Sequence, residues 1–318
     1  MFDIQVVQGF FTQNPISSAA ILILFLWIVY VQIHNHLHLD WGYARIRGLL
    51  ESTDDLKQST TANELYEAKF FAAMCAQAYR LAYVNDSKKS QAKRDLNQFL
   101  SDSSWKLLPP SEAVPKQPYG KARRARLDGE LVYGIWFRKL KTGTVQIALV
   151  FRGTHTLGDW WSNLRWFTKY IPILNGWDQY DLTQTVAHYV ANDLVGHHKD
   201  LQGNGEPEII AAGHSLGGGL AHQAGYATKA IKRVYSFNGT SVTGFFSLSK
   251  NERYKEGMRI YRIGERGEIL ALLRNTMKIL FPVVQINPKI VEATYNFGPA
   301  GVTAHSIDDM AIAMIDAG

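Results

Sequence analysis

Hydrophobic residues recur along the chain at spacings that distinguish helices from strands. From Thr61 to Tyr83 they recur at three- and four-residue steps, which predicts an amphipathic helix with one buried face. Short apolar runs predict strands at Leu131–Phe137, Val145–Phe151, Glu208–Ala212, Ile231–Phe237, Arg259–Ile263 and Ile290–Phe297. Further helices are expected at Asp178–Val195, Leu216–Thr228 and Ile307–Ile315. Strands separated by helices predict an α/β fold with a mostly parallel sheet.

Two connecting segments have their own patterns. A Lys-Thr-Gly turn at Lys141–Gly143 joins two of the strands and predicts a hairpin. The stretch from Asn85 to Asp128 is polar, contains four prolines and includes a basic cluster between Lys121 and Arg126. This composition predicts irregular surface structure and no second core.

The N-terminus is the most apolar part of the chain. Ile16 to Ile33 is an uncharged stretch of eighteen residues, and as a helix it would rise about 27 Å, close to the ~30 Å of a bilayer core. We expect a retained transmembrane anchor; a buried or interfacial helix and a cleaved signal peptide are the alternatives. Against a signal peptide, no Lys or Arg precedes Arg45. Arg45 and Arg47 on one side, against Asp3 on the other, favour a single-pass anchor with a cytoplasmic main domain.

Composition narrows the functional classes. Of the 318 residues, 19% are charged and 46% hydrophobic, and a charged share below the usual ~25% argues against a disordered chain or a coiled coil. The single cysteine, Cys75, excludes an intramolecular disulfide and a CxxC-type metal or redox site. The net charge of +6 suits anionic surfaces. No nucleic-acid partner is expected, since the Lys121–Arg126 cluster has no aromatic platform beside it.

The segment Gly213-His214-Ser215-Leu216-Gly217 carries the clearest chemistry. It matches the GxSxG pattern of a nucleophile elbow, in which glycines flank a serine held on a tight turn from strand to helix. A predicted strand precedes the motif and a glycine-rich helix start follows it, as the pattern requires. Ser215 is therefore the candidate nucleophile, and the backbone N–H of Leu216 would face a developing oxyanion.

A second motif, Phe151-Arg152-Gly153-Thr154, ends a predicted strand and precedes a segment with Asp159-Trp160. FRGT and a DW-containing segment, followed by GHSLGG about sixty residues later, resemble the fungal-type, class 3 lipases of the α/β-hydrolase superfamily. The resemblance covers roughly residues 65–305. It implies that Thr154 is the second oxyanion-hole donor and that a lid lies near Leu157–Tyr170, with Trp160, Trp161 and Trp166 as lid candidates.

A serine nucleophile requires a base and an acid that orients the base. His305 is the only histidine after His222, and His222 lies seven residues into the helix after the elbow, where packing is the simpler role. The family pattern places an Asp six residues after an Arg that ends a strand; from Arg262 this position is Glu268, which departs from the usual Asp. The alternatives for the acid are Glu265, Asp308 and Asp309, although the last two are expected to begin a helix.

Together these features predict two regions and one activity. Residues 1–40 would hold the anchor, and residues 41–318 would form an α/β-hydrolase domain that cleaves lipid esters, phospholipid or acylglycerol, through a Ser-His-Glu triad at a membrane. The basic excess favours phospholipid. No metal or cofactor is expected. The alternatives are a lipase effector delivered to the membrane of another cell, and a membrane-anchored protein that keeps the fold without turnover.

Overall fold

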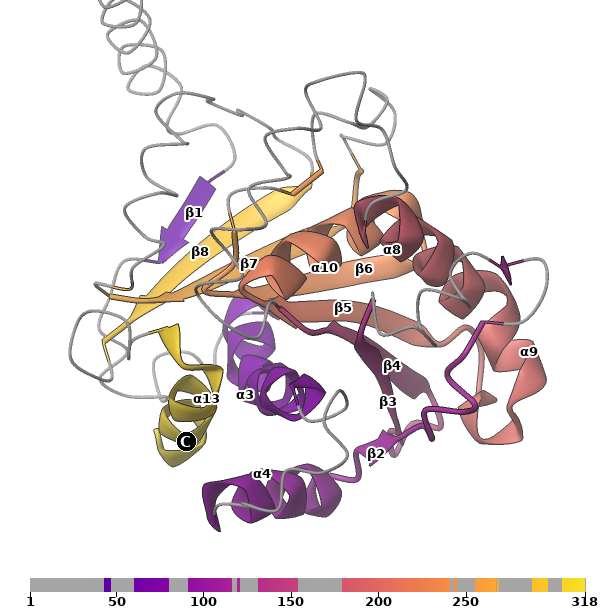
Figure 1. Cartoon of the computed structure of the whole chain (residues 1–318), viewed down its shortest axis with the longest axis horizontal. Coiled ribbons are helices and arrows are strands. Elements are labelled where there is room, and N and C mark those ends of the chain that lie inside the picture. Colours follow the sequence, from indigo (N-terminus) through magenta and orange to yellow (C-terminus); the bar gives the residue numbers. More distant parts are fainter. Residues whose placement is uncertain are drawn as a thin grey trace, which may run out of the picture.

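The computed structural model describes residues 43–46, 60–79, 91–115, 119–120, 131–153, 179–240, 243–244, 255–266, 268, 288–296 and 305–317. Within these ranges the chain forms one sheet of eight strands in the order β1-β8-β7-β6-β5-β4-β3-β2 (Figure 1). The strands are β1 (Tyr43–Ile46), β2 (Lys106–Leu107), β3 (Tyr133–Lys139), β4 (Val145–Phe151), β5 (Glu208–His214), β6 (Ile231–Phe237), β7 (Arg259–Glu265) and β8 (Lys289–Tyr295).

The sheet is parallel from β4 through β5, β6, β7 and β8 to β1. Among the described strands, only β2, β3 and β4 pair in antiparallel fashion, and the β3–β4 hairpin closes where the Leu140 N–H donates to the Thr144 carbonyl, 2.9 Å away. The predicted α/β class, its mostly parallel sheet and the Lys141–Gly143 turn are confirmed.

Helices cover both faces of the sheet (Figure 1). The helical elements are α3 (Thr60–Ala78), α4 (Gln91–Asp102), α8 (Gln179–Tyr189), the π-helix η3 (Val190–Leu194), α9 (Val195–His197), the 3₁₀-helix η4 (Lys199–Leu201), α10 (Leu216–Ala227) and α13 (Ile307–Asp316). One core cluster lies between the sheet and α8 and α10, and the other lies between the sheet and α3, α4 and α13. Strand β4 is buried along its whole length, with Leu149 facing the first cluster and Val150 the second. Burial on both faces explains why such strands are continuous apolar runs.

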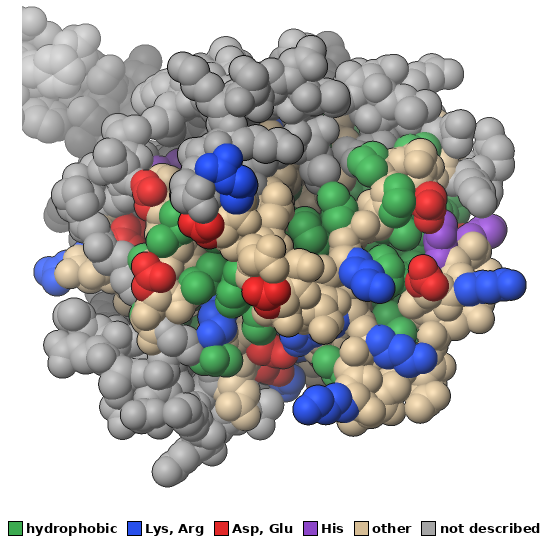
Figure 2. All heavy atoms as spheres, turned by 90° about the horizontal axis from the view of Figure 1, so that it is seen from below, with side chains coloured by type: hydrophobic (Ala, Val, Ile, Leu, Met, Phe, Trp, Pro, Cys, Tyr) green, Lys and Arg blue, Asp and Glu red, His purple; other side chains and the backbone are tan. Residues whose placement is uncertain are grey.

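The prediction that Asn85–Asp128 is irregular surface was wrong for α4 and β2. Leu96, Phe99 and Leu100 form a short apolar stripe at three- and four-residue spacing on an otherwise polar helix; the two leucines are buried, and Phe99 stacks on Phe70 at 5.2 Å between ring centroids. A helix that contributes three apolar residues is easily mistaken for a polar loop. On the face seen from below, acidic and basic side chains are interspersed with hydrophobic ones (Figure 2).

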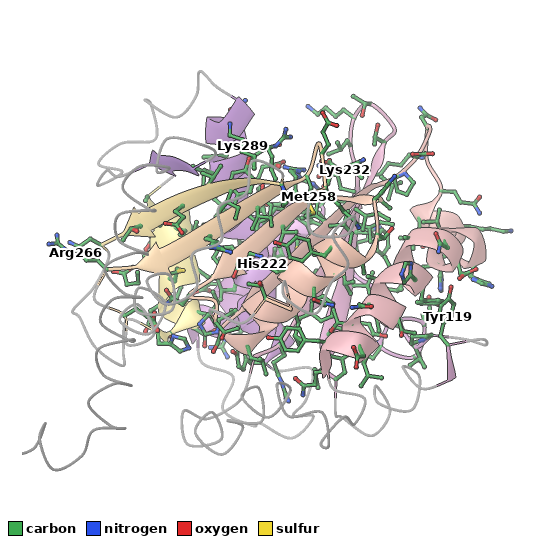
Figure 3. The ribbon with its side chains drawn as sticks, turned by 90° about the horizontal axis from the view of Figure 1, so that it is seen from above. Tyr119, His222, Lys232, Met258, Arg266 and Lys289 are labelled. Carbon is green, nitrogen blue, oxygen red and sulfur yellow. The ribbon has the colours of Figure 1, made fainter. Side chains whose placement is uncertain are left out.

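Helix α3 is held to the sheet by ion pairs at the edge where the parallel strands begin. Arg259 forms a bidentate contact with Glu64, at 2.8 Å and 2.5 Å. Arg233 lies between Glu67 and Glu208, at 2.5 Å and 2.6 Å. Lys232 and Met258 mark this edge in Figure 3, and Arg266 marks the opposite edge, where the strands end. The network fixes the start of α3 and leaves its last turn pointing toward the strand ends.

The predicted anchor, Ile16–Ile33, lies outside the described residues. Among the helices within the described ranges, none combines the length and the apolar composition needed to cross a bilayer.

Candidate active site

Ser215 occupies a strained turn between β5 and α10. Its φ of 58° and ψ of −123° lie where residues with a side chain are rarely found. Hydrogen bonds hold the turn: the Ser215 N–H donates to the Phe237 carbonyl at 3.0 Å, and the Ser215 carbonyl accepts from the N–H groups of Gly218 and Thr240, each at 3.0 Å. This is the strand–turn–helix context that the GxSxG pattern requires of a nucleophile elbow.

The glycines around Ser215 are required by the close approach of neighbouring backbone. A Cβ on Gly213 would lie 2.0 Å from the Gly217 carbonyl oxygen, and one on Gly217 would lie 2.4 Å from the Phe151 carbonyl oxygen. Both contacts are shorter than any van der Waals separation and involve main-chain atoms. The motif's glycines therefore allow β4, β5 and α10 to meet at the elbow.

The structure brings Glu268 and His305 together. His305 Nδ1 lies 2.6 Å from Glu268 Oε1, and the Glu268 side chain is fully enclosed. Glu268 follows β7 and His305 precedes α13, so 36 intervening residues separate two groups that meet at the carboxyl edge of the sheet. A carboxylate on Nδ1 fixes the ring orientation and leaves Nε2 to exchange a proton.

The other candidate acids lie at the end of β7 and in the first turn of α13. The backbone N–H of Glu265 donates to Asn238 Oδ1 at 2.9 Å, which fixes Glu265 at the end of β7. Asp308 and Asp309 lie in the first turn of α13, where the Asp309 N–H donates to the N-cap Ser306 Oγ at 3.3 Å. Acidic residues at that position stabilise the helix start, as the sequence indicated.

His222 is a core residue of α10. It is 1% exposed, lies in the interior of the molecule (Figure 3), and its ring packs 6.3 Å from that of Tyr226. Burial, and then the charge of Arg262, hold the pKa of His222 well below its usual value. A histidine kept neutral inside the core fits the packing role expected from its distance to Ser215.

Thr154 and the lid candidates Trp160, Trp161 and Trp166 lie outside the described residues. Leu216 is the first residue of α10, where an N–H has no partner within the helix.

Among the described residues no group of three His, Cys, Asp or Glu side chains could hold a metal ion. Cys75 is buried in α3, and burial raises the pKa of its thiol.

Tyr79 and His214, for which the sequence pattern predicted no catalytic role, are connected to His305 by hydrogen bonds. Tyr79, just after α3, places its hydroxyl 2.8 Å from His214 Nδ1. His214 Nε2 lies 2.8 Å from the His305 carbonyl oxygen, and the two imidazole centroids are 4.6 Å apart. His214 stands next to Ser215 in the sequence, but no spacing rule connects it to a tyrosine 135 residues earlier.

Comparisons with known proteins identify no function directly. A family model described as a domain of unknown function, DUF6792, matches residues 119–259; this range includes Ser215 and ends before Glu268 and His305. No curated protein matches the sequence. The resemblance to class 3 lipases therefore stays a prediction.

The chain is similar to several solved hydrolases and esterases at low identity. One is a dienelactone hydrolase from Anabaena variabilis, with 14% identity and a TM-score of 0.34 over 59% of this chain and 91% of that one. Another is an esterase from Pyrobaculum calidifontis, with 12% identity and a TM-score of 0.31 over 75% and 95%. A third is a thermostable esterase from Pseudomonas putida, with 12% identity and a TM-score of 0.35 over 76% and 94%.

Proposed function

We propose that this chain is a serine ester hydrolase of the α/β-hydrolase type, with Ser215 as nucleophile, His305 as base and Glu268 as the acid that orients the base. The observation that carries the proposal is the enclosed contact between His305 Nδ1 and Glu268 Oε1, at 2.6 Å, on the same edge of the sheet as the strained elbow of Ser215. A nucleophile, then an orienting carboxylate, then a histidine base, in this chain order, are typical of α/β-hydrolases.

In the proposed reaction, His305 Nε2 removes the Ser215 proton as Ser215 Oγ attacks the ester carbonyl carbon. The N–H groups of Leu216 and Thr154 stabilise the oxyanion of the tetrahedral intermediate. His305 then protonates the leaving alcohol, which yields the acyl-enzyme. Water, deprotonated by His305, attacks the acyl carbon; His305 then returns that proton to Ser215 Oγ as the carbon–Oγ bond breaks, which releases the carboxylic acid and regenerates Ser215. Glu268 keeps the proton on Nδ1 and stabilises the imidazolium.

Kinetics on a soluble short-chain ester test the triad. Ser215→Ala should lower kcat by at least about 10³-fold, and Glu268→Gln by about 10²- to 10⁴-fold, because the amide no longer stabilises the imidazolium. Glu265→Gln is the matched control, since it changes a buried carboxyl three residues away and should change kcat little. Equal losses for the two glutamine variants would reject Glu268 as the orienting acid.

We further propose lipid esters, and phospholipids in particular, as the substrate class. The proposal rests on the uncharged Ile16–Ile33 stretch, the aromatic segment with Trp160, Trp161 and Trp166, and the net charge of +6. Incubating the enzyme with a total lipid extract should deplete phospholipids measured by mass spectrometry, and Ser215→Ala should deplete none. Loss of triacylglycerol without loss of phospholipid would overturn the phospholipid preference.

The membrane proposal assigns Ile16–Ile33 to a single-pass anchor with the catalytic domain in the cytoplasm. Replacing Leu24 and Leu26 by lysine places two charges near the middle of the stretch, each costing about 2.5–3.5 kcal/mol on insertion. The variant should move from the membrane fraction to the supernatant, whereas the wild-type protein stays in the membrane and is degraded by protease added from the cytoplasmic side. Wild-type protein found in the supernatant would reject the anchor.

A further inference from the structure

We infer that Tyr79 and His214 act as a pair of positioning residues that hold the catalytic histidine and the oxyanion-hole loop in register. The inference rests on the proposed hydrolase function and assigns roles to two residues outside the triad. Two hydrogen bonds carry it, from Tyr79 to His214 and from His214 to the His305 carbonyl, and they connect the end of β5 to the residue just before α13.

The contact with the His305 carbonyl fixes which nitrogen of His214 carries the proton. A carbonyl oxygen only accepts, so His214 Nε2, at 2.8 Å from the His305 carbonyl, carries a proton and donates it. The neutral ring then has an acceptor at Nδ1, and the Tyr79 hydroxyl, at 2.8 Å, donates to it. Enclosure by the protein raises the pKa of Tyr79 well above its usual value, so the phenol keeps the proton that this bond requires.

The same hydroxyl also contacts the loop that follows β4. A Cβ on Gly153 would lie 2.5 Å from the Tyr79 oxygen and 3.1 Å from Ser215 Cβ, so the hydroxyl packs closely against this glycine. Gly153 immediately precedes Thr154, the proposed oxyanion donor. One tyrosine hydroxyl therefore joins the loop of the oxyanion hole to the residue beside the nucleophile.

His214 connects Tyr79 to the proposed catalytic base, His305. Its Nε2–H holds the His305 main chain, and its ring lies 4.6 Å from the His305 ring, while Glu268 holds His305 Nδ1 from the other side. Catalytic groups displaced by about 1 Å can lose about 10²-fold in rate. Losing the Tyr79 hydroxyl should therefore affect the chemical step more than substrate binding.

Replacement of Tyr79 by phenylalanine is the direct test, with hydrolysis of a soluble short-chain ester as the readout. The Tyr79→Phe variant should lose between about 10- and 100-fold in kcat while KM changes less than about twofold. Tyr235→Phe is the matched control, because Tyr235 also donates to α3, to the Glu64 carbonyl at 2.9 Å, but at the other edge of the sheet. Tyr235→Phe should lower the urea concentration at the midpoint of unfolding and leave kcat unchanged. An unchanged kcat in Tyr79→Phe, or an equal loss in Tyr235→Phe, would overturn the inference.

A double-mutant cycle separates positioning from independent damage. His214→Asn keeps an acceptor oxygen near the position of Nδ1 for the Tyr79 hydroxyl, but its shorter side chain has no N–H at the position of Nε2 to reach the His305 carbonyl. If Tyr79 acts through His214, the combined variant should lose much less kcat than the product of the two single losses; multiplicative losses would reject the coupling. If the wild-type protein has no esterase activity, both the proposed function and this inference are rejected. If the wild type and Tyr79→Phe are equally active, only this inference is rejected.

Discussion

The conformation of Ser215 depends on neighbours that lack side chains. At this turn, where Ser215 has a φ of 58°, β4, β5 and the first turn of α10 approach one another more closely than side chains allow. The strain is maintained by hydrogen bonds to Phe237, Gly218 and Thr240. At the scale of single residues, the elbow therefore depends on close backbone packing as much as on the serine itself.

Alanine at Gly217 tests this dependence. Its Cβ would lie 2.4 Å from the Phe151 carbonyl oxygen, so the backbone must move; we expect a loss of about 1–3 kcal/mol in the free energy of unfolding together with most of the esterase activity. Gly196→Ala in α9 is the control, because no atom lies within 4 Å of its added Cβ. It should be neutral or stabilising in urea titrations, and a Gly217→Ala variant as stable and active as the wild type would refute the packing argument.

The buried His222 should make stability depend on pH. Its folded pKa is lowered by burial and by the charge of Arg262, so below about pH 6.5 the unfolded chain binds the proton first. Stability should therefore be full above that pH and fall as the pH drops toward the folded pKa. Between pH 7 and 5.5 the free energy of unfolding should fall by about 1 kcal/mol more in wild type than in His222→Leu. If urea titrations show the same fall in the free energy of unfolding for the wild type and His222→Leu, the fold does not keep this histidine neutral.

At the scale of helices and strands, the burial of an element decides how well its apolar pattern predicts its position. Strands β4 and β6 begin and end where their apolar runs predict, because each is enclosed on both faces. Strand β5 extends two residues beyond its predicted end, through Gly213 and His214, since the elbow rather than hydrophobicity ends it. Helix α8 changes to a π-helix at Val190, a change in hydrogen bonding that leaves the apolar period nearly intact. Helix α4 was missed because its apolar stripe is too short.

Ion pairs between residues far apart in the chain could not be predicted from sequence patterns. Arg233 contacts Glu67 and Glu208, which lie 166 and 25 positions away in the chain. Arg233→Met should lower the free energy of unfolding by about 3 kcal/mol, at the low end for a broken buried pair because both carboxylates are partly exposed. Glu292→Gln, which loses a contact of 3.8 Å to Arg262, should cost less than about 1 kcal/mol. Similar denaturation midpoints for the two variants would contradict the assigned role of the network.

At the scale of the whole molecule, the sheet gathers residues that the sequence could propose only one at a time. The GxSxG pattern and the last histidine of the chain make Ser215 and His305 candidates, because each of these signals is local. The contact between Glu268 and His305 depends on the ends of β7 and β8 meeting, and the pattern offered Glu265, Asp308 and Asp309 as well. The contact between Tyr79 and His214 joins the residue after α3 to the elbow, and no local signal marks it.

The central claim is that this arrangement activates Ser215 as a nucleophile, and a covalent serine probe tests it most directly. The full-length protein is incubated with a fluorophosphonate, digested, and analysed by mass spectrometry for the modified residue. We predict one phosphonylated serine, Ser215, in the wild type, no label in Ser215→Ala, and labelling at least about 10²-fold slower in Glu268→Gln. A wild-type protein that stays unlabelled, or is labelled equally in Ser215→Ala, would contradict the account.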